Sequence, residues 1–216
     1  MVYQQCTMLD KLLKEGNMIF DLFSTPLRID NLNRNVHPHE AETLEKLIGI
    51  TKNNLGNERS ASSNVLDHPL LSELAFSCTE SLNNFAREEL KIVQTSFRIT
   101  QSWVNVSYKN GYHFAHSHPN SVFSGVLYLQ ASEPDQIMFH RHREETSWRF
   151  AYDEWNGYNS KTWTVPVKTG DIVIFPSQLV HEVPLIQNKK RVSLAFNSFP
   201  VGTFGMEQES TLVEMR

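Results

Sequence analysis

Histidines are the residues of this sequence whose type and spacing could most readily do chemistry. His113, His116 and His118 lie close together, while His181 stands apart at the end of the pattern GDIVIFPSQLVH. Side chains on a strand alternate between two faces, so we expect His116 and His118 on one face and His113 on the other. Two imidazoles on one face can hold a metal ion, and His181 is the natural third ligand. The spacing predicts a metal site made of these three residues.

The remaining histidines fit ordinary positions better than a metal site. His140 and His142 also form an H-x-H pair, but charged residues surround it: Arg141, Arg143, Glu144 and Glu145. A solvated loop or a hairpin edge accounts for that pair. Three others are expected at helix entries or on the surface: His37, His39 and His68.

Arg191 follows His181 after ten residues, and Ser193 lies on the same face of the predicted strand. An arginine that faces a barrel interior is costly unless it meets an anion. A planar guanidinium can hold a carboxylate with two parallel hydrogen bonds, and a neighbouring hydroxyl can add a third. From position alone, a carboxylate anchor beside the metal site and a structural ion pair at a strand edge both stay open.

The second half of the chain contains the strands that must position these residues. Alternating or β-branched apolar patterns predict strands at residues 96–108, 121–130, 161–168, 171–177 and 191–199. Short strands separated by Gly or Pro turns are typical of a closed or sandwiched β architecture. We therefore expect a mainly β fold with flanking helices, whose core is a double-stranded β-helix (a jelly roll, cupin-like).

The first half of the chain is more helical. Residues 18–32 predict an entry strand broken by Pro26, and residues 38–50 carry apolar positions at helical spacing. Residues 51–64 are rich in Asn, Ser and Gly and predict a loop. Residues 68–91 form the longest helical pattern, with one apolar stripe. That stripe would either pack on the sheet or form a homodimer.

Length and composition limit the classes that need to be considered. The 216 residues suit a single domain, 1–216, with an entry-strand and helical region over about 1–92 and a catalytic core over about 93–204. The net charge of -4 without a basic block gives no nucleic-acid signature. No apolar run is long enough to span a membrane or to form a signal core. Cys6 and Cys78 lack metal spacing, so we expect both to be reduced and the compartment to be cytoplasmic.

The motifs together resemble a known superfamily. The pattern H116-S-H118, then G170-DIVIFPSQLV-H181, then R191-V-S193 is similar to that of the iron(II)/2-oxoglutarate oxygenases. The H-x-H-P-N spelling resembles a narrower group of small oxygenases found in bacteria and in phages of marine cyanobacteria. The resemblance covers roughly residues 95–200 and is loose before that.

The resemblance implies a role for each histidine of the predicted metal site. His116 and His181 match the two histidine ligands of the superfamily. His118 stands where most members have Asp or Glu, which completes their two-histidine, one-carboxylate iron site. Three neutral imidazoles would leave the site one charge more positive than the usual set. Whether His118 binds iron at all stays open.

The resemblance also implies residues for the co-substrate. Arg191 matches the basic residue that binds the distal carboxylate of 2-oxoglutarate, and Ser193 matches its hydroxyl partner. Asn105 and Tyr108 lie on a strand that often lends polar side chains to the co-substrate, whereas Tyr128 is equally well explained as core packing.

The implied activity is that of an iron(II)- and 2-oxoglutarate-dependent oxygenase, expected to be a hydroxylase. It would use Fe(II), 2-oxoglutarate and O2, and would couple the oxidative decarboxylation of 2-oxoglutarate to succinate with oxidation of an unknown prime substrate. The alternatives are a three-histidine metal dioxygenase or a cupin-type enzyme that does not use 2-oxoglutarate, and a non-enzymatic, metal-stabilised binding module. Exposed aromatic residues within 146–163 would favour a binding module, and a pocket that opens at His181 would favour an enzyme. Residues 140–157 are expected to form a long solvated hairpin or a substrate-recognition loop.

Overall fold

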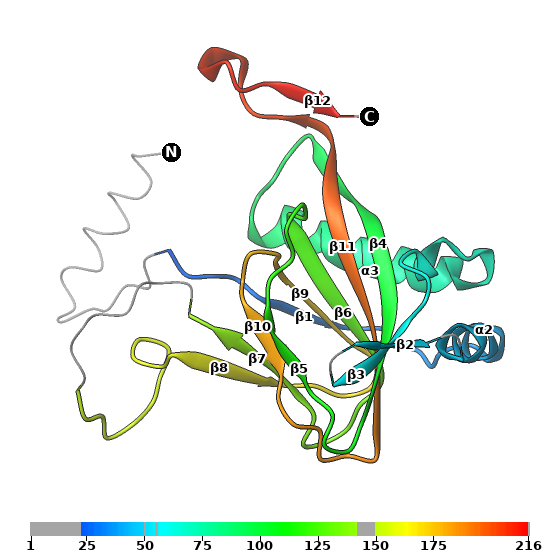
Figure 1. Ribbon diagram of the computed structural model, residues 1–216. Coiled ribbons are helices and arrows are strands. Elements are labelled where there is room, and N and C mark those ends of the chain that lie inside the picture. Colours follow the sequence, from blue (N-terminus) through cyan, green and yellow to red (C-terminus); the bar gives the residue numbers. More distant parts are fainter. Residues whose placement is uncertain (1–22, 50, 55, 142–149, 216) are drawn as a thin grey trace.

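Two antiparallel sheets face each other in the computed structural model, and helices cover the outer side of the larger sheet (Figure 1). The structure describes residues 23–49, 51–54, 56–141 and 150–215, with only the backbone for residues 51–54. One apolar cluster lies between the helices and the larger sheet, and a second lies between the two sheets. This arrangement confirms the predicted mainly β fold with a jelly-roll core and flanking helices.

The larger sheet carries most of the strands that were expected from the sequence. Its strands, in spatial order, are β1 (Arg28–Asn31), β9 (Asp171–Pro176), β6 (Phe123–Gln130), β11 (Lys190–Phe204), β4 (Thr95–Tyr108), β3 (Asn57–Ser60) and β2 (Thr51–Asn54). The strand β12 (Val213–Met215) pairs with the end of β11. The long strands β4 and β11 pair along almost their whole length and form the centre of the sheet.

The smaller sheet holds the histidines. Its strands, in spatial order, are β5 (His113–His116), β10 (His181–Val183), β7 (Gln136–His140) and β8 (Thr162–Pro166). The three-residue strand β10 lies between β5 and β7, so its first residue has partners on both sides. Strands β7 and β8 pair with each other, which confirms a long hairpin around the segment that was expected to be a hairpin or a recognition loop.

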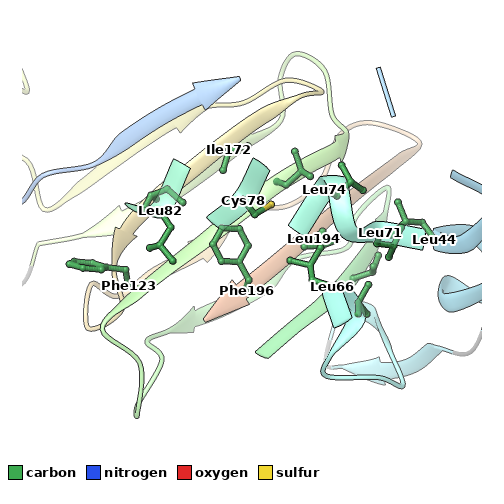
Figure 2. Packing of buried hydrophobic residues seen from close by; sticks show 14 of the residues in the cluster. Leu44, Leu66, Leu71, Leu74, Cys78, Leu82, Phe123, Ile172, Leu194 and Phe196 are labelled. Atoms are coloured by element: carbon green, nitrogen blue, oxygen red, sulfur yellow. The ribbon is translucent and has the colours of Figure 1, made fainter. Parts of the chain in front are cut away.

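The helices pack on the larger sheet through the predicted apolar stripe. The helical elements are α2 (Pro38–Ile48), the 3-10 turns η1 (Val65–Asp67), η2 (Pro69–Leu71) and η4 (Glu207–Glu209), the helix α3 (Ser72–Asn84), and the π-helical turn η3 (Phe85–Glu89). Leu74, Cys78 and Leu82 of α3 are fully buried against Leu194 and Phe196 of β11, as Figure 2 shows. The stripe is therefore used inside the fold, and a homodimer would need another surface.

The prediction of a loop over residues 51–64 is wrong for its first part. Strands β2 and β3 form a hairpin there, and β3 extends the larger sheet by pairing Arg59 with Asn105 of β4. Polar residues at an exposed sheet edge satisfy their backbone groups by pairing, without the apolar alternation that marks a half-buried strand. The sequence pattern therefore did not reveal the hairpin.

Strand β11 is buried on both faces, and each face has its own chemistry. Val192, Leu194 and Phe196 point toward the helices and are apolar, whereas Arg191 and Ser193 belong to the opposite, inner face. A strand between two packed layers must bury both faces, so polar residues on the inner face require partners or a ligand. The inner face of β11 is therefore the part of the fold to examine for function.

A glycine allows the outer face of β11 to pack closely. Gly125 of β6 is paired with Phe196, and a Cβ atom at Gly125 would lie 2.2 Å from the Phe196 ring and 2.7 Å from Ile174. Such contacts are far too short, so any larger residue would push the ring out of its place under α3.

The N-terminal region contributes to the same sheet. Part of the predicted entry strand, residues 18–32, is confirmed as β1, which pairs with β9; residues 18–22 lie outside the described residues. Cys78 is a free, buried thiol whose pKa burial raises to about 12, and Cys6 lies outside the described part of the chain. Among the described helices, none is long and apolar enough to cross a membrane.

Candidate active site

The three histidines expected to bind a metal come together between the sheets. His116 ends β5 and His181 begins β10, and the two are direct cross-strand partners with ring centroids 4.4 Å apart. His118 follows β5, where its backbone N–H donates to the carbonyl of Ser177 at 2.9 Å. One ligand atom from each ring lies within 4.8 Å of the others. These distances suit a single ion bound on one side by three imidazoles.

Backbone carbonyls orient two of the three rings. His116 Nδ1 donates to the Phe114 carbonyl at 2.7 Å, and His181 Nδ1 donates to the Leu179 carbonyl at 2.9 Å. A carbonyl can only accept, so each Nδ1 carries the proton and each Nε2 keeps its lone pair for a metal. This is the usual outer-shell support of a metal-binding histidine. His118 has no such ring hydrogen bond to any described residue; its ring packs 5.6 Å from that of Trp103.

Burial keeps the imidazoles of His118 and His181 neutral. It lowers the pKa of His118 to about 3 and the pKa of His181 to about 4, helped by the neighbouring histidines. The Phe175 ring, 4.6 Å from that of His181, is part of the apolar wall that excludes water there. Because only neutral imidazole binds a metal, His118 and His181 are in the form that could bind one across the neutral pH range.

His113 is not where the sequence placed it. Strict alternation put its side chain on the face opposite to His116, but its ring lies 4.3 Å from the His116 ring and lines the same cavity. The pairing of His116 with His181 and of His113 with Val183 leaves an irregularity, in which β5 has one more residue than β10. A bulge of this kind resets the alternation and returns both side chains to one side.

Of the other described histidines, His37, His39 and His68 lie at helix entries or on the surface, as predicted, whereas His140 lies close to His181 on the neighbouring strand β7. His37 precedes α2 and His39 lies in its first turn, while His68 joins two 3-10 turns and accepts from the N–H of Leu70. His140 ends β7, with its Nε2 3.4 Å from a Glu182 carboxylate oxygen. His142 lies outside the described residues.

Arg191 and Ser193 lie on the inner face of β11, as predicted. Arg191 is only 3% exposed, and none of the described carboxylates lies within 4.0 Å of its guanidinium. Its guanidinium carbon is 5.0 Å from the centre of the Tyr128 ring. The structural ion pair that was the alternative explanation is therefore absent from the described residues, and the cation is free to meet an anion.

Three strands place polar groups around Ser193. Its cross-strand partners are Asn105 on β4 and Tyr128 on β6. Asn105 Oδ1, the Tyr128 hydroxyl and Arg191 Nε are all buried without a hydrogen-bond partner among the described residues. Native proteins seldom leave buried polar atoms unpaired, so a cluster of them indicates a missing ligand. A carboxylate would accept from Arg191, Tyr128 and Ser193, and from Asn105 if its amide is turned to present Nδ2.

Tyr108 is not brought to this cluster. It pairs with Lys190 at the end of β4, one residue out of phase with Asn105, so the two side chains leave the strand on opposite faces. Tyr108 is 49% exposed. Tyr128, which the sequence left equally open to core packing, is fully buried and faces Arg191 instead.

A cavity of about 640 Å³ opens beside the histidines. Its lining includes His116 and His118 but not His181, which is nearly buried behind them. The pocket therefore opens at His116 and His118 rather than at His181. Its remaining lining residues are Arg59, Thr100, Gln101, Trp103, His113, Pro119, Asn120, Asn197 and Phe199.

A buried hydrogen-bond network fixes one wall of this cavity. The hydroxyl oxygens of Ser177 and Ser124 are hydrogen-bonded at 2.8 Å, and the Ser124 hydroxyl donates to Asn197 Oδ1 at 2.8 Å. Asn197 Nδ2 in turn donates to Gln101 at 3.2 Å. The same Ser177 holds the backbone of His118, so the metal site and this wall share one rigid support.

Aromatic side chains are exposed on the hairpin between β7 and β8. They are Phe150, Tyr152, Trp155, Tyr158 and, on β8 itself, Trp163. This is the feature that the sequence associated with a binding module. The exposed aromatic residues and the histidine cavity are both present, so the aromatic residues do not distinguish a binding module from an enzyme.

Comparison with known proteins shows which family the second half of the chain resembles. Residues 101–197 match the family described as "Putative 2OG-Fe(II) oxygenase". This segment contains the three histidines, Arg191 and Ser193. This segment is similar to the 2OG-Fe(II) oxygenases, and the match covers a little less than half of the chain. No curated protein matches the chain in sequence.

Solved structures show the same fold at low sequence identity. HygX from Streptomyces hygroscopicus, solved with nickel and 2-oxoglutarate bound, has a TM-score of 0.56 and 13% identity, covering 81% of this chain and 82% of its own. A Trichoplax adhaerens prolyl hydroxylase in complex with a hypoxia-inducible-factor peptide has a TM-score of 0.54 and 13% identity, covering 82% and 85%. An oxidoreductase of the 2OG-Fe(II) oxygenase family from Burkholderia pseudomallei has a TM-score of 0.52 and 13% identity, covering 74% and 79%. These solved structures and this chain thus share one fold.

Sequence reasoning missed several residues of the cavity. Gln101 and Trp103 continue the inner-face alternation of β4 that leads to Asn105, so that pattern could have identified them. Asn197 could have been found in the same way on β11. Arg59 could not, because its strand was taken for a loop.

Proposed function

We propose that His116, His118 and His181 hold the Fe(II) of this oxygenase and that Arg191 binds the distal carboxylate of 2-oxoglutarate. The observation that supports this most strongly is the buried Arg191 guanidinium on the inner face of the same fold that gathers the histidines, with no carboxylate of the described residues within 4.0 Å of it. A buried charge without a partner is costly, and a carboxylate co-substrate would remove that cost. When bound, iron and 2-oxoglutarate would activate O2: the oxidative decarboxylation of 2-oxoglutarate to succinate and carbon dioxide takes up one oxygen atom, and the other oxidises the prime substrate.

The residues around Arg191 would complete the carboxylate site. Ser193 and Tyr128 each offer a hydroxyl, and Asn105 offers an amide from the neighbouring strand. Arginine and a hydroxyl can together make three hydrogen bonds to one carboxylate. Tyr108, which points to the other face, is left out of this site.

His118 would give the iron a third imidazole where most members of the superfamily have a carboxylate. Its pKa of about 3 means that it stays neutral, so the site carries more positive charge than the usual set. That charge would favour the dianionic co-substrate. The missing ring hydrogen bond leaves His118 less firmly oriented than His116 and His181.

The protein would also position the prime substrate and exclude water. The cavity beside His116 and His118 is the place where a substrate bond could approach the metal, and we propose hydroxylation of that bond as the outcome. Fold alone does not select a substrate, because one scaffold supports many chemistries.

Release of carbon dioxide from carboxyl-labelled 2-oxoglutarate tests the assignment. The wild-type protein with Fe(II) and ascorbate should release labelled carbon dioxide slowly even without a prime substrate. His181→Ala should reduce the release to background, and Arg191→Gln should reduce it at low 2-oxoglutarate, whereas Tyr108→Phe should leave it unchanged. Release that survives in His181→Ala, or that is lost equally in Tyr108→Phe, would contradict the assignment.

A further inference from the structure

Arg59 is a second arginine on the inner face of the larger sheet, and the proposed iron and co-substrate sites do not use it. It lies on β3 and pairs with Asn105 across β4. Two strand spacings separate β3 from β11, or roughly 10 Å across the sheet. Arg59 and Arg191 therefore lie at different positions on the inner face, and of the two only Arg59 lines the open cavity.

The guanidinium of Arg59 is held in place without a counter-ion. Its carbon lies 4.9 Å from the centre of the Trp103 ring, and Nη2 donates to the Ser63 hydroxyl at 3.1 Å. No ion pair joins it to a carboxylate of the described residues. A guanidinium has five N–H donors, so most of them are left for a ligand. Stacking on a buried Trp also limits its motion, which reduces the entropy lost on binding.

The rest of the cavity lining matches a small anion. Besides the histidines and Arg59, the lining includes three amide side chains: Gln101, Asn120 and Asn197. No Asp or Glu among the described residues lines the cavity. The hydrogen bond from Ser124 orients the amide of Asn197, so that its Nδ2 faces Gln101 at the cavity. A volume of about 640 Å³ is in the range of small-molecule sites.

We propose that the cavity binds a small prime substrate through a carboxylate or phosphate group held by Arg59. Trp103 forms the flat support under the guanidinium, and Asn197 and Gln101 supply hydrogen bonds to the polar part of the substrate. The group to be oxidised would then lie toward His116 and His118, which line the same cavity. This inference rests on the proposed function for the place of the reaction, but not for the anion site itself.

Matched aromatic probes test the anion site. Benzoate, phenyl phosphate and benzamide share one ring, and only the first two carry a charge at neutral pH. Each is titrated into the zinc-loaded protein in saturating 2-oxoglutarate, while the indole N–H signal of Trp103, assigned with Trp103→Phe, is followed by NMR. We expect at least one of the two acids to shift this signal and to bind about 10-fold or more tightly than benzamide, as a hydrogen-bonded charge predicts. The affinity for benzoate compared with that for phenyl phosphate then shows whether the site prefers a carboxylate or a phosphate group.

Two substitutions make the test specific to Arg59. Arg59→Gln should weaken acid binding about 10-fold or more, and Arg59→Lys should weaken it less because the charge stays. Arg98→Gln, an exposed arginine on β4, should have no effect. Equal binding of benzamide, unchanged affinity in Arg59→Gln, or the absence of any acid-induced shift would overturn the proposal.

The same samples separate this proposal from the proposed function. Arg59→Gln should keep the wild-type affinity for 2-oxoglutarate, and an affinity that falls as in Arg191→Gln would assign Arg59 to the co-substrate and overturn the substrate site. If the wild-type protein binds no 2-oxoglutarate, the proposed function fails, while the acid titration without it still reports on Arg59.

Discussion

His116 and His181 each donate Nδ1 to the carbonyl of the residue two positions earlier. This local contact needs no distant partner, so it forms as soon as the strand end takes its conformation. It fixes the tautomer in which Nε2 is free, and therefore prepares both rings for a metal before one arrives. His118 lacks the contact and depends on its neighbours for orientation.

Substitution of the histidines should affect metal binding unequally. We expect His116→Ala or His181→Ala to weaken Fe(II) or Zn(II) binding by at least about 100-fold, more than the loss of an outer-shell partner costs. His118→Ala should weaken it less, and His118→Asp should restore it by supplying a carboxylate. Competition with a metal-binding dye measures all four affinities. Full-strength binding in His181→Ala would show that the ion lies elsewhere.

Arg191 offers a test of the co-substrate site that does not depend on turnover. Because its guanidinium matches a carboxylate with two hydrogen bonds, both Arg191→Gln and Arg191→Lys should lose affinity for 2-oxoglutarate. The loss should be about 10- to 100-fold for Gln, as expected for charged hydrogen bonds. Calorimetric titration of the nickel-loaded protein measures it. If Ser193→Ala costs as much as Arg191→Gln, then the guanidinium is not the main contact.

At the scale of elements, α3 supports the sheet that carries Arg191. Leu82 is fully buried between α3 and the sheet, in the cluster that also contains Leu194 of β11. Leu82→Ala should lower the free energy of unfolding by about 2–5 kcal/mol, because it removes apolar contact and leaves a cavity. Glu80→Ala, on the exposed side of α3, should change it by less than about 0.5 kcal/mol. Urea denaturation measures the free energy of unfolding of both variants. Similar losses in the two would show that the apolar stripe of α3 is not the stabilising contact.

Elements with a strong apolar pattern could be predicted from the sequence, and elements defined by pairing could not. Strands β4, β6, β9 and β11 and helix α3 bury residues at regular spacing, so their patterns are visible in the chain. The hairpin of β2 and β3 has no such pattern, because its strands gain their stability from the edge of β4. The missed hairpin also hid Arg59.

In the molecule as a whole, the two sheets contribute different residues to the candidate site. The smaller sheet and the turn after β5 supply the histidines, and the larger sheet supplies Arg191, Ser193 and the cavity wall. Motif spacing was enough to single out the three histidines that the fold brings together and the arginine that it buries on the inner face of β11. The position of His113 was not predictable, because a bulge in β5 becomes visible only when its pairing with β10 is known.

Burial of the histidines should make the metal-free protein sensitive to acid. Folding lowers the pKa of His118 to about 3 and that of His181 to about 4, against 6.5 for a free imidazole. Between these values the unfolded chain takes up protons that the folded chain does not, so stability falls as the pH drops from about 6.5 toward 4. The stability that these groups contribute is fully present above pH 6.5.

A double substitution isolates this effect from the carboxylates. Urea midpoints of the metal-free protein, measured from pH 7.5 to 4.5, should fall more steeply for the wild type than for His118→Gln/His181→Gln. The difference in slope reflects the protons that the two histidines bind in the unfolded chain but not in the folded one. Parallel curves for the two proteins would mean that these imidazoles titrate normally in the folded state.

The central claim is that three histidines and one buried arginine hold iron and 2-oxoglutarate together. The most direct measurement is an anaerobic titration of the Fe(II)-loaded protein with 2-oxoglutarate, following the visible charge-transfer band that appears when the keto acid chelates ferrous iron. We predict a band that saturates at one equivalent in the wild type, is lost in His181→Ala, and needs higher 2-oxoglutarate in Arg191→Gln. A folded, iron-loaded wild-type protein that gives no band would contradict the account.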